Sequence, residues 1–315
     1  MPSPSPPPPP TEPTLPELRV LVAIAEHGSF TAAGSRLGLT QSAVSHTVRT
    51  CERKLGVVLF DRGRHGARPT EAGLRAVARA RRILRLLETM RDETRGPGPA
   101  GLTGPLRIAA FRSAAAHLLP GPLARLRARH PGLTPEVRIV REIGRGTTGE
   151  VADGRADLAI ATLDDSSAAM VSARLVTEPY SLVAPADHPD PRSLPLVDWA
   201  ENCGSCTRDW WSRQDWIPPA TIDAEDDSVV LSMVAQGLGM AIMPALSLAS
   251  APSTVTVTDL GEERPTRAVG YVTTPELAGS AAVRELIREL RSARTLPPAQ
   301  GTSSAFQREC TTSPS

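Results

Sequence analysis

Hydrophobic positions near the start of the chain recur with the period of an α-helix. A face at the i, i+3, i+4, i+7 spacing predicts a buried helix over residues 15–27. The residues on that face are Leu18, Leu21, Val22 and Ala25. Gly28 is expected to end the helix, because glycine readily takes the left-handed conformation that a helix C-terminus uses. Ser29 or Thr31 is then expected to cap a short second helix.

A third helix is predicted over residues 41–55, after a turn at Gly38 and with Thr40 as its N-cap. The residues expected to face the core are Ala43, Val44, Val48 and Leu55. The solvent side of its first half carries short or basic hydrogen-bonding groups, namely Gln41, Ser42, Ser45, His46 and Arg49. Such a helix after a tight turn indicates a helix-turn-helix whose second helix enters the DNA major groove. Thr31 and Thr40 join these residues as candidate DNA contacts.

A short β-wing is predicted over residues 56–69, where an apolar stretch is followed by arginines around two glycines. Arg62 and Arg64 are the wing residues expected to reach the DNA backbone or minor groove. From Arg36 to Arg85 the chain carries twelve Lys or Arg against three acids, a net charge of +9, whereas the whole chain carries +1. This asymmetry favours one domain that meets phosphates and another that does not. A helical domain with a solvated basic face is the alternative.

The same segment resembles the N-terminal winged helix-turn-helix of LysR-type transcriptional regulators. The resemblance is carried by SFTAAGSRLGLTQSAVSHTV, then KLGVVLF-D-R, then PTEAG, within residues 15–75, and it continues more loosely to about residue 293. Cys51 stands where the family usually has leucine, and His46 where many members have arginine. Cys51 is expected to pack as a small apolar group.

A long helix is predicted over residues 71–95, capped by Thr70. Apolar residues along it repeat at spacings of four and three, which is typical of a coiled-coil seam: Ala76, Ala80, Ile83, Leu87 and Met90. The alternative is an amphipathic helix packed on its own domain. The resemblance implies a dimer linker, and a two-fold dimer would bind two half-sites of a pseudo-palindromic operator.

From Pro105 onward, apolar strands alternate with helices, which predicts an α/β domain of two packed lobes. The stretch 266–272 and a helix over 281–293 are candidates to return to the first lobe. The resemblance implies a periplasmic-binding-protein-like effector domain in which the chain crosses between the lobes and a ligand binds in the cleft.

Ligands of open α/β sheets bind near the carboxyl ends of strands. Three places in the sequence meet this condition. The candidate effector-binding residues are Phe111, Arg112 and Ser113 after the first strand, Thr162 after a later one, and Ser205, Cys206 and Thr207 in the second lobe. The resemblance places Ser113 where many members use a hydroxyl. Helix capping is the alternative role for each hydroxyl. Arg112 favours an acidic effector if it points inward.

The four cysteines leave a second sensing chemistry open. Cys203 and Cys206 form a C-x-x-C that can act as a redox switch or simply as thiols lining a pocket. Cys310 has no evident partner. No ligand set for zinc completes the motif, so no metal and no cofactor are expected. The G-x-G-x-x-G at 144–149 is followed by a helix too short for a dinucleotide crossover, and no catalytic motif is found.

The sequence therefore predicts a cytoplasmic transcriptional regulator that binds double-stranded DNA and a small-molecule effector as a homodimer or homotetramer, without enzymatic activity or membrane contact. The expected parts are a Pro-rich tail (1–13), a winged helix-turn-helix (14–70), a linker helix (71–95), a hinge (96–104), a two-lobed effector domain (105–296) and a second tail (297–315). The rival prediction is a cytosolic small-molecule-binding module or enzyme with a non-specific basic head.

Overall fold

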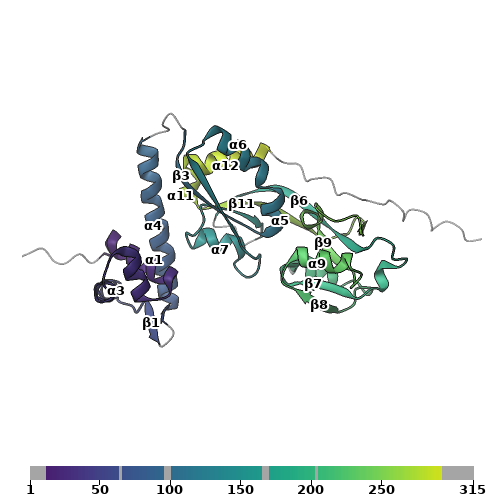
Figure 1. The fold of residues 1–315 in the computed structure, drawn as a ribbon, viewed down its shortest axis with the longest axis horizontal. Helices are drawn as coiled ribbons and strands as arrows, with labels where there is room; N and C mark the ends of the chain where they lie inside the picture. The colour runs from purple at the N-terminus through teal and green to yellow at the C-terminus, as the bar shows by residue number, and fades with distance from the viewer. Residues whose placement is uncertain (1–11, 64–65, 96–100, 165–169, 203–204, 293–315) are drawn as a thin grey trace, which may run out of the picture. The chain divides into compact units, whose positions relative to one another are not determined.

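A computed structural model describes residues 12–63, 66–95, 101–164, 170–202 and 205–292 (Figure 1). The chain divides into two compact units. Unit 1 comprises Met1–Leu102 with Gly149–Ala156, and unit 2 comprises Thr103–Thr148 with Asp157–Ser315.

Unit 1 contains the predicted helix-turn-helix with a hairpin and a long helix. Its elements are α1 (Leu15–His27), α2 (Phe30–Leu37), α3 (Gln41–Leu55), β1 (Phe60–Gly63), β2 (Gly66–Pro69) and α4 (Glu71–Arg95). Local capping explains the ends of the helices. Ser29 Oγ accepts from the Ala32 amide at 3.0 Å, and Thr40 Oγ1 accepts from the Ala43 amide at 3.2 Å. The helix bounds over 15–27, 41–55 and 71–95 are confirmed.

A glycine permits the tight turn between α2 and α3. The Gly34 backbone lies so close to the Leu39 carbonyl that an added Cβ would stand 2.6 Å from its oxygen. Gly38 has φ +69°, the left-handed region that a side chain disfavours. The turn therefore depends on glycine at both positions, as the sequence pattern indicated for Gly38.

The core of unit 1 joins α1, α3 and the first half of α4. Val44, Val48 and Cys51 of α3 are fully buried in it, together with Val77 and Ala80 of α4. Ala80 therefore packs within its own domain, and the coiled-coil expectation is wrong for this residue.

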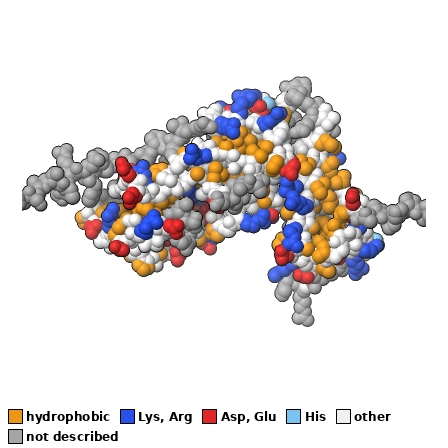
Figure 2. Space-filling view, turned by 180° about the vertical axis from the view of Figure 1, so that it is seen from behind, with side chains coloured by type: hydrophobic (Ala, Val, Ile, Leu, Met, Phe, Trp, Pro, Cys, Tyr) orange, Lys and Arg blue, Asp and Glu red, His pale blue; other side chains and the backbone are white. Residues whose placement is uncertain are grey.

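The second half of α4 keeps exposed apolar residues. Ile83 is 43% exposed and Met90 55% exposed. Figure 2 shows hydrophobic side chains gathered along α4. Leu55, which we expected in the core, is exposed because it lies in the last turn of α3.

The wing is the two-stranded antiparallel hairpin of β1 and β2, with Phe60 opposite Pro69 and Gly63 opposite Gly66. The base of the hairpin is held by backbone contacts on both strands. The Ala67 amide donates to the Gly28 carbonyl at 2.8 Å, and the Thr70 amide donates to the Leu59 carbonyl at 2.9 Å. These contacts connect the wing to the end of α1 and to the start of α4.

Unit 2 is a mixed α/β structure in which one curved sheet serves two lobes. Its strands are β3 (Gly104–Ala110), β4 (Leu133–Ile139), β5 (Leu158–Thr162), β6 (Val171–Pro185), β7 (Leu196–Trp199), β8 (Ala220–Ala224), β9 (Ala241–Pro244), β10 (Val255–Asp259) and β11 (Thr266–Thr273). Its helices are α5 (Arg112–His117), α6 (Pro120–Arg129), α8 (Ser205–Trp211), α9 (Asp227–Ala235), α10 (Ala245–Leu248), α11 (Pro275–Ala278) and α12 (Ala281–Ser292), with 3-10 turns Pro191–Ser193 and Ala200–Asn202. The short α7 (Gly146–Ala152) crosses the boundary of the two units.

The long strand β6 connects the lobes. The main sheet has the order β10-β6-β11-β5-β3-β4, and β9 also pairs with β6. The first part of β6 pairs antiparallel with β11, and its last part pairs with β9 and β10. Strand β11 then returns the chain to the first lobe, where it pairs antiparallel with β5. The predicted crossing between lobes is confirmed.

Candidate nucleic-acid interface and effector cleft

The outward face of α3 is polar along its length. Gln41, Ser42, His46 and Arg49 are exposed, while Val44, Val48 and Cys51 fill the opposite face. Ser45 departs from the prediction: it is only 7% exposed, because it lies on the Val48 side of the helix. The expectation that Ser45 lies on the solvent side is therefore wrong.

Arg53 extends the exposed face and was missed in the sequence. It follows Arg49 by four residues, so Ser42, His46, Arg49 and Arg53 continue one helical stripe. Its guanidinium lies 3.4 Å from Thr50 Oγ1. The same period that identified the buried face would have identified this arginine. The face therefore offers an amide, a hydroxyl, an imidazole and two guanidinium groups, which are the groups that hydrogen-bond base edges and phosphates.

The remaining predicted DNA contacts lie beside α3. Thr31 is exposed on α2, and the hydroxyl of Thr40 caps α3 and lies 2.9 Å from Ser42 Oγ. The backbone of Arg62 lies in β1, but its side chain is outside the part of the chain that the structure describes, as is all of Arg64.

A shielded ion pair fixes the end of α3 against the start of α1. Lys54 Nζ lies 2.9 Å from both carboxylate oxygens of Glu17, which also accepts from the Thr14 amide at 2.6 Å. Burial raises the pKa of Glu17, but hydrogen bonds from Thr14 and Lys54 outweigh it and keep the pKa below its ordinary value. Burial raises the pKa of the neighbouring Cys51 thiol to about 11. Cys51 is therefore an inert packing residue, as expected.

In unit 2, the predicted effector residues at the end of β3 separate into buried and exposed groups. Phe111 and Ser113 are buried, and the Phe111 ring lies 4.8 Å below the guanidinium of Arg267. The Arg112 side chain is 53% exposed and forms ion pairs with Asp226 and, at 3.7 Å, with Asp227 at the start of α9. Arg112 thus connects the first lobe to the second, and its cation is already matched by the chain's own carboxylates.

The polar groups at the end of β5 are also hydrogen-bonded to a carboxylate of the same chain. The Thr162 amide donates to Glu142 Oε1 at 2.7 Å, and the amide and hydroxyl of Thr147 donate to Glu142 Oε2 at 2.9 and 3.0 Å. Burial raises the pKa of Glu142, and these hydrogen bonds only partly oppose the rise. Thr162 is therefore placed at a polar cluster, but its donor serves an internal carboxylate that was not foreseen in the sequence.

A buried ion pair lies at the crossing of β6 and β11. The carboxylate of Glu178 is fully buried, and it accepts from Arg267 Nε at 2.6 Å and from the Leu246 amide at 2.7 Å. Arg141 and Glu201 approach to 3.5 Å. Burial raises the pKa of Glu201, and the nearby charge of Asp227 adds to the rise.

Sequence reasoning did not identify the contacts of Glu142, Glu178 and Glu201. Asp226 caps α9, because its carboxylate accepts from the Ser228 amide at 2.9 Å. Burial raises the pKa of Asp226, but hydrogen bonds from Ser228 and Arg112 hold it below its ordinary value.

Only part of the C-x-x-C segment belongs to the residues that the structure describes. Cys203 is outside the described residues, as is Cys310, and only the backbone of Ser205 and Cys206 is placed, at the start of α8. Thr207 is buried. The redox alternative therefore stays a prediction.

Two further features of the first lobe are an apolar groove and a cluster of charged side chains. An apolar groove of about 560 Å³ is lined by α5, α6 and β4, and it shares only Arg112 with the predicted effector residues.

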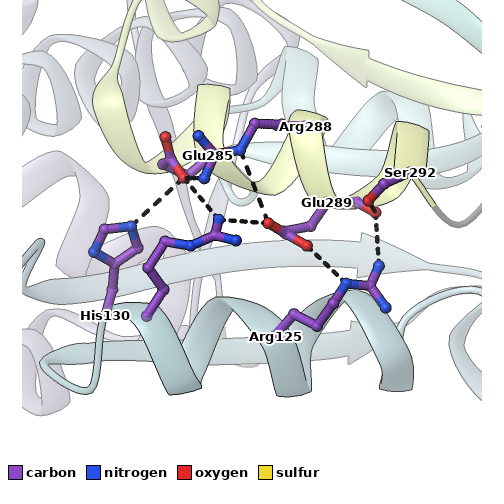
Figure 3. Close-up of polar contacts among 7 residues, drawn as sticks. Arg125, His130, Glu285, Arg288, Glu289 and Ser292 are labelled. Carbon is purple, nitrogen blue, oxygen red and sulfur yellow. Dashed lines mark hydrogen bonds and ion pairs between the residues drawn. The ribbon is translucent and has the colours of Figure 1, made fainter.

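On α6, Arg125 and Arg129 hold the carboxylate of Glu289 from α12 at 2.8 and 2.6 Å (Figure 3). The hydrogen bond from Arg125, assisted by Arg129 against the effect of burial, lowers the pKa of Glu289. This cluster attaches α12 to the first lobe.

Within the described part of the chain, no group of three or more His, Cys, Asp or Glu residues is arranged to hold a metal ion. No described helix is long and apolar enough to cross a membrane. The G-x-G-x-x-G segment leads into α7, which has only seven residues.

A winged helix-turn-helix with a polar outward face, followed by a two-lobed α/β domain, defines a ligand-responsive transcriptional regulator. Residues 15–74 match the bacterial regulatory helix-turn-helix protein, lysR family, and residues 99–295 match the LysR substrate binding domain. The chain belongs to the LysR family of transcriptional regulators.

Similar proteins agree with this assignment. The Probable HTH-type transcriptional regulator LrrA of Synechococcus elongatus is 36% identical over 251 residues, which cover 76% of this chain and 83% of LrrA. ArgP from Mycobacterium tuberculosis has a similar fold, with a TM-score of 0.69 at 21% identity over 89% of this chain and 97% of ArgP. Full-length CbnR in complex with its target DNA has a TM-score of 0.60 at 19% identity, over 89% of this chain and 99% of CbnR. As a LysR-type regulator, the protein binds DNA, takes an effector in its C-terminal domain and oligomerises.

Proposed function

We propose that the exposed face of α3 reads the operator. The observation that carries this proposal is the continuous stripe of Ser42, His46, Arg49 and Arg53, opposite a face buried in unit 1. Arginine hydrogen-bonds guanine and Gln41 can hydrogen-bond adenine in the major groove. Because the buried face fixes the helix rotation, these side chains present one surface to the duplex.

We infer that the flanking groups position the domain on the phosphate backbone. Thr31, Thr40, Arg62 and Arg64 are the proposed backbone contacts, since hydroxyl and guanidinium groups bind phosphate oxygens without reading sequence. Ser45 is assigned to packing, because of its burial. The exposed Ile83, Leu86 and Met90 support the second half of α4 as the surface on which two copies pair.

For the effector, we propose a site at the polar cluster between the lobes, with Arg112 and Thr162 among the contacts. This cluster consists of the donors Arg112, Thr162 and Arg267 and their carboxylate partners Asp226, Asp227, Glu142 and Glu178. An acidic effector has to displace Glu142 from Thr162, or Asp226 from Arg112, because both donors are occupied. Displacement would break contacts between the lobes, which offers a route from effector binding to a change in DNA affinity. Phe111, Ser113 and Thr207 are buried, and together with Ser205 and Cys206 they stay as proposed effector contacts.

The proposed role is regulation without catalysis, in the cytoplasm, where DNA and small metabolites are both accessible. The family match and the absence of any catalytic motif in the sequence support this proposal.

A DNA titration tests the proposal. Fluorescence anisotropy would compare the DNA that flanks the protein's own gene with a scrambled duplex at fixed near-physiological salt. A preference of about 10³ or more for the flanking DNA is expected for specific regulation. Equal binding that weakens steeply with salt would favour a non-specific basic head.

A further inference from the structure

Glu52 is an acid on the recognition helix itself. It is one of three acids among the twelve basic residues between Arg36 and Arg85, and its charge opposes the approach of DNA phosphates. A carboxylate at this place therefore lowers DNA affinity unless it performs another task.

The contacts of Glu52 identify that task. Its Oε1 accepts from the Leu59 amide at 2.8 Å and from the Phe60 amide at 3.4 Å. Leu59 and Phe60 are buried, and Phe60 begins β1, the first strand of the wing. The Phe60 ring also meets Phe30 of α2 edge to face, with centroids 6.3 Å apart.

The backbone of Glu52 binds the beginning of the segment that joins α3 to β1. Its carbonyl accepts from the Gly56 amide, which ends α3, and from the Val57 amide at 3.2 Å. One residue thus binds both ends of the segment between α3 and β1.

A second side chain supports this segment without any charge. Thr70 Oγ1 lies 2.9 Å from the Val58 carbonyl and 3.3 Å from the Leu59 carbonyl, and it accepts from the Gly73 amide at 3.0 Å. The start of β1 is consequently fixed to α3 by Glu52 and to α4 by Thr70.

We propose that Glu52 is a positioning residue for DNA binding, which fixes the wing hairpin relative to the recognition helix so that both meet the duplex together. The inference uses the family's DNA binding and does not depend on which bases α3 reads. Losing the acceptor oxygen of Glu52 together with its charge should therefore weaken DNA binding, whereas electrostatics alone predicts tighter binding.

The test uses the full-length protein and a random-sequence duplex of about four helical turns, so that no operator is needed. Fluorescence anisotropy would be measured between about 50 and 200 mM KCl. The variants are Glu52→Ala, Glu52→Gln and, as a control with the same loss of charge, Asp61→Asn on the exposed side of β1.

Asp61→Asn is expected to bind about two- to fivefold more tightly than the wild type, because one repulsive charge is gone. Glu52→Gln should match it, since the amide oxygen still accepts from Leu59 and Phe60. Glu52→Ala should bind about five- to tenfold more weakly than the wild type, with a salt slope smaller by about one, as expected when a phosphate contact is lost. A merely electrostatic residue would give all three variants the same increase.

The proposal is overturned if Glu52→Ala binds as tightly as the wild type or more tightly, or if Glu52→Gln binds more weakly than the wild type. If Glu52→Ala does not fold, Thr70→Val decides together with Glu52→Gln. Thr70→Val leaves the charge unchanged, so weaker binding by Thr70→Val alone supports the positioning role, and unchanged binding contradicts it.

Discussion

The recognition helix and the cluster between the lobes use polar side chains in opposite ways. On α3, the polar groups of His46 and Arg49 face outward, and the opposite face of the helix is buried. Between the lobes, Arg112, Arg267 and the Thr162 amide are each matched to a carboxylate of the same chain. DNA therefore meets exposed side chains on α3 whose contacts, such as that of Arg53 with Thr50, are themselves exposed, whereas an effector has to compete with partly or fully buried carboxylates.

The largest expected effect concerns the most buried of these internal pairs. Arg267→Met leaves the fully buried carboxylate of Glu178 without its cation. The free energy of unfolding is expected to fall by about 3–5 kcal/mol, because an unpaired buried charge is strongly destabilising. Urea unfolding followed by tryptophan fluorescence would measure the change.

The matched control is Arg264→Met, which removes a more exposed arginine paired with Asp259. Its expected cost is below about 1 kcal/mol, as is usual for surface pairs. Equal losses of unfolding free energy for the two variants would show that the buried pair of Arg267 and Glu178 stabilises the protein no more than an exposed pair does.

The pH dependence of stability distinguishes two carboxylates of unit 2. The pKa of Glu289 is lowered from 4.5 mainly by the hydrogen bond from Arg125, so its stabilising contribution is present above about pH 4.5 and is lost as pH falls through the folded-state pKa. The destabilisation by Glu289→Gln should therefore shrink on acidification.

Glu142 should behave in the opposite direction. Burial raises its pKa from 4.5, so the native state gains stability below that value and loses it as pH rises through the folded-state pKa. Glu142→Gln should consequently become more stable relative to the wild type as pH rises. Urea unfolding at several pH values would check both signs, and parallel behaviour of the two variants would contradict the assignment.

The smallest effect is expected for the exposed pair between the lobes. Arg112→Gln removes a half-exposed cation from Asp226 and Asp227. It should change the free energy of unfolding by less than about 1 kcal/mol. A cost above about 2 kcal/mol in thermal or urea unfolding would mean that this pair holds the lobes together far more strongly than its exposure allows.

Unit 1 could be predicted almost completely because its signals are local. Gly28, Gly38 and Thr40 act on groups within a few residues, and they set the helix bounds correctly. The errors there concern the surroundings of single residues, namely Ser45, Leu55 and Ala80. Ser45 was assigned to the exposed face, yet it precedes the buried Val48 by three residues and turns to the same side.

The cluster between the lobes could not be predicted, because its partners are distant in sequence. Arg112 and Asp226 are 114 positions apart, and Arg267 and Glu178 are 89 positions apart. The types of residue at the strand ends were identified, but no local period specifies which carboxylate reaches which donor. Strand β11 returns between β5 and β6, and only this tertiary pairing brings Arg267 over Phe111.

Sequence reading by α3 is tested by the ratio of specific to non-specific DNA affinity for the wild type and for Arg49→Ala, with Arg19→Ala on the exposed surface of α1 as the control. Each protein would be titrated with the operator in the DNA that flanks the protein's own gene and with its scrambled sequence at one salt concentration. Arg49→Ala is expected to lower operator affinity by about 10- to 100-fold and scrambled-DNA affinity only a few-fold, whereas Arg19→Ala should leave the ratio unchanged. An equal loss on both duplexes would contradict the claim that the outward face of α3 reads the DNA sequence.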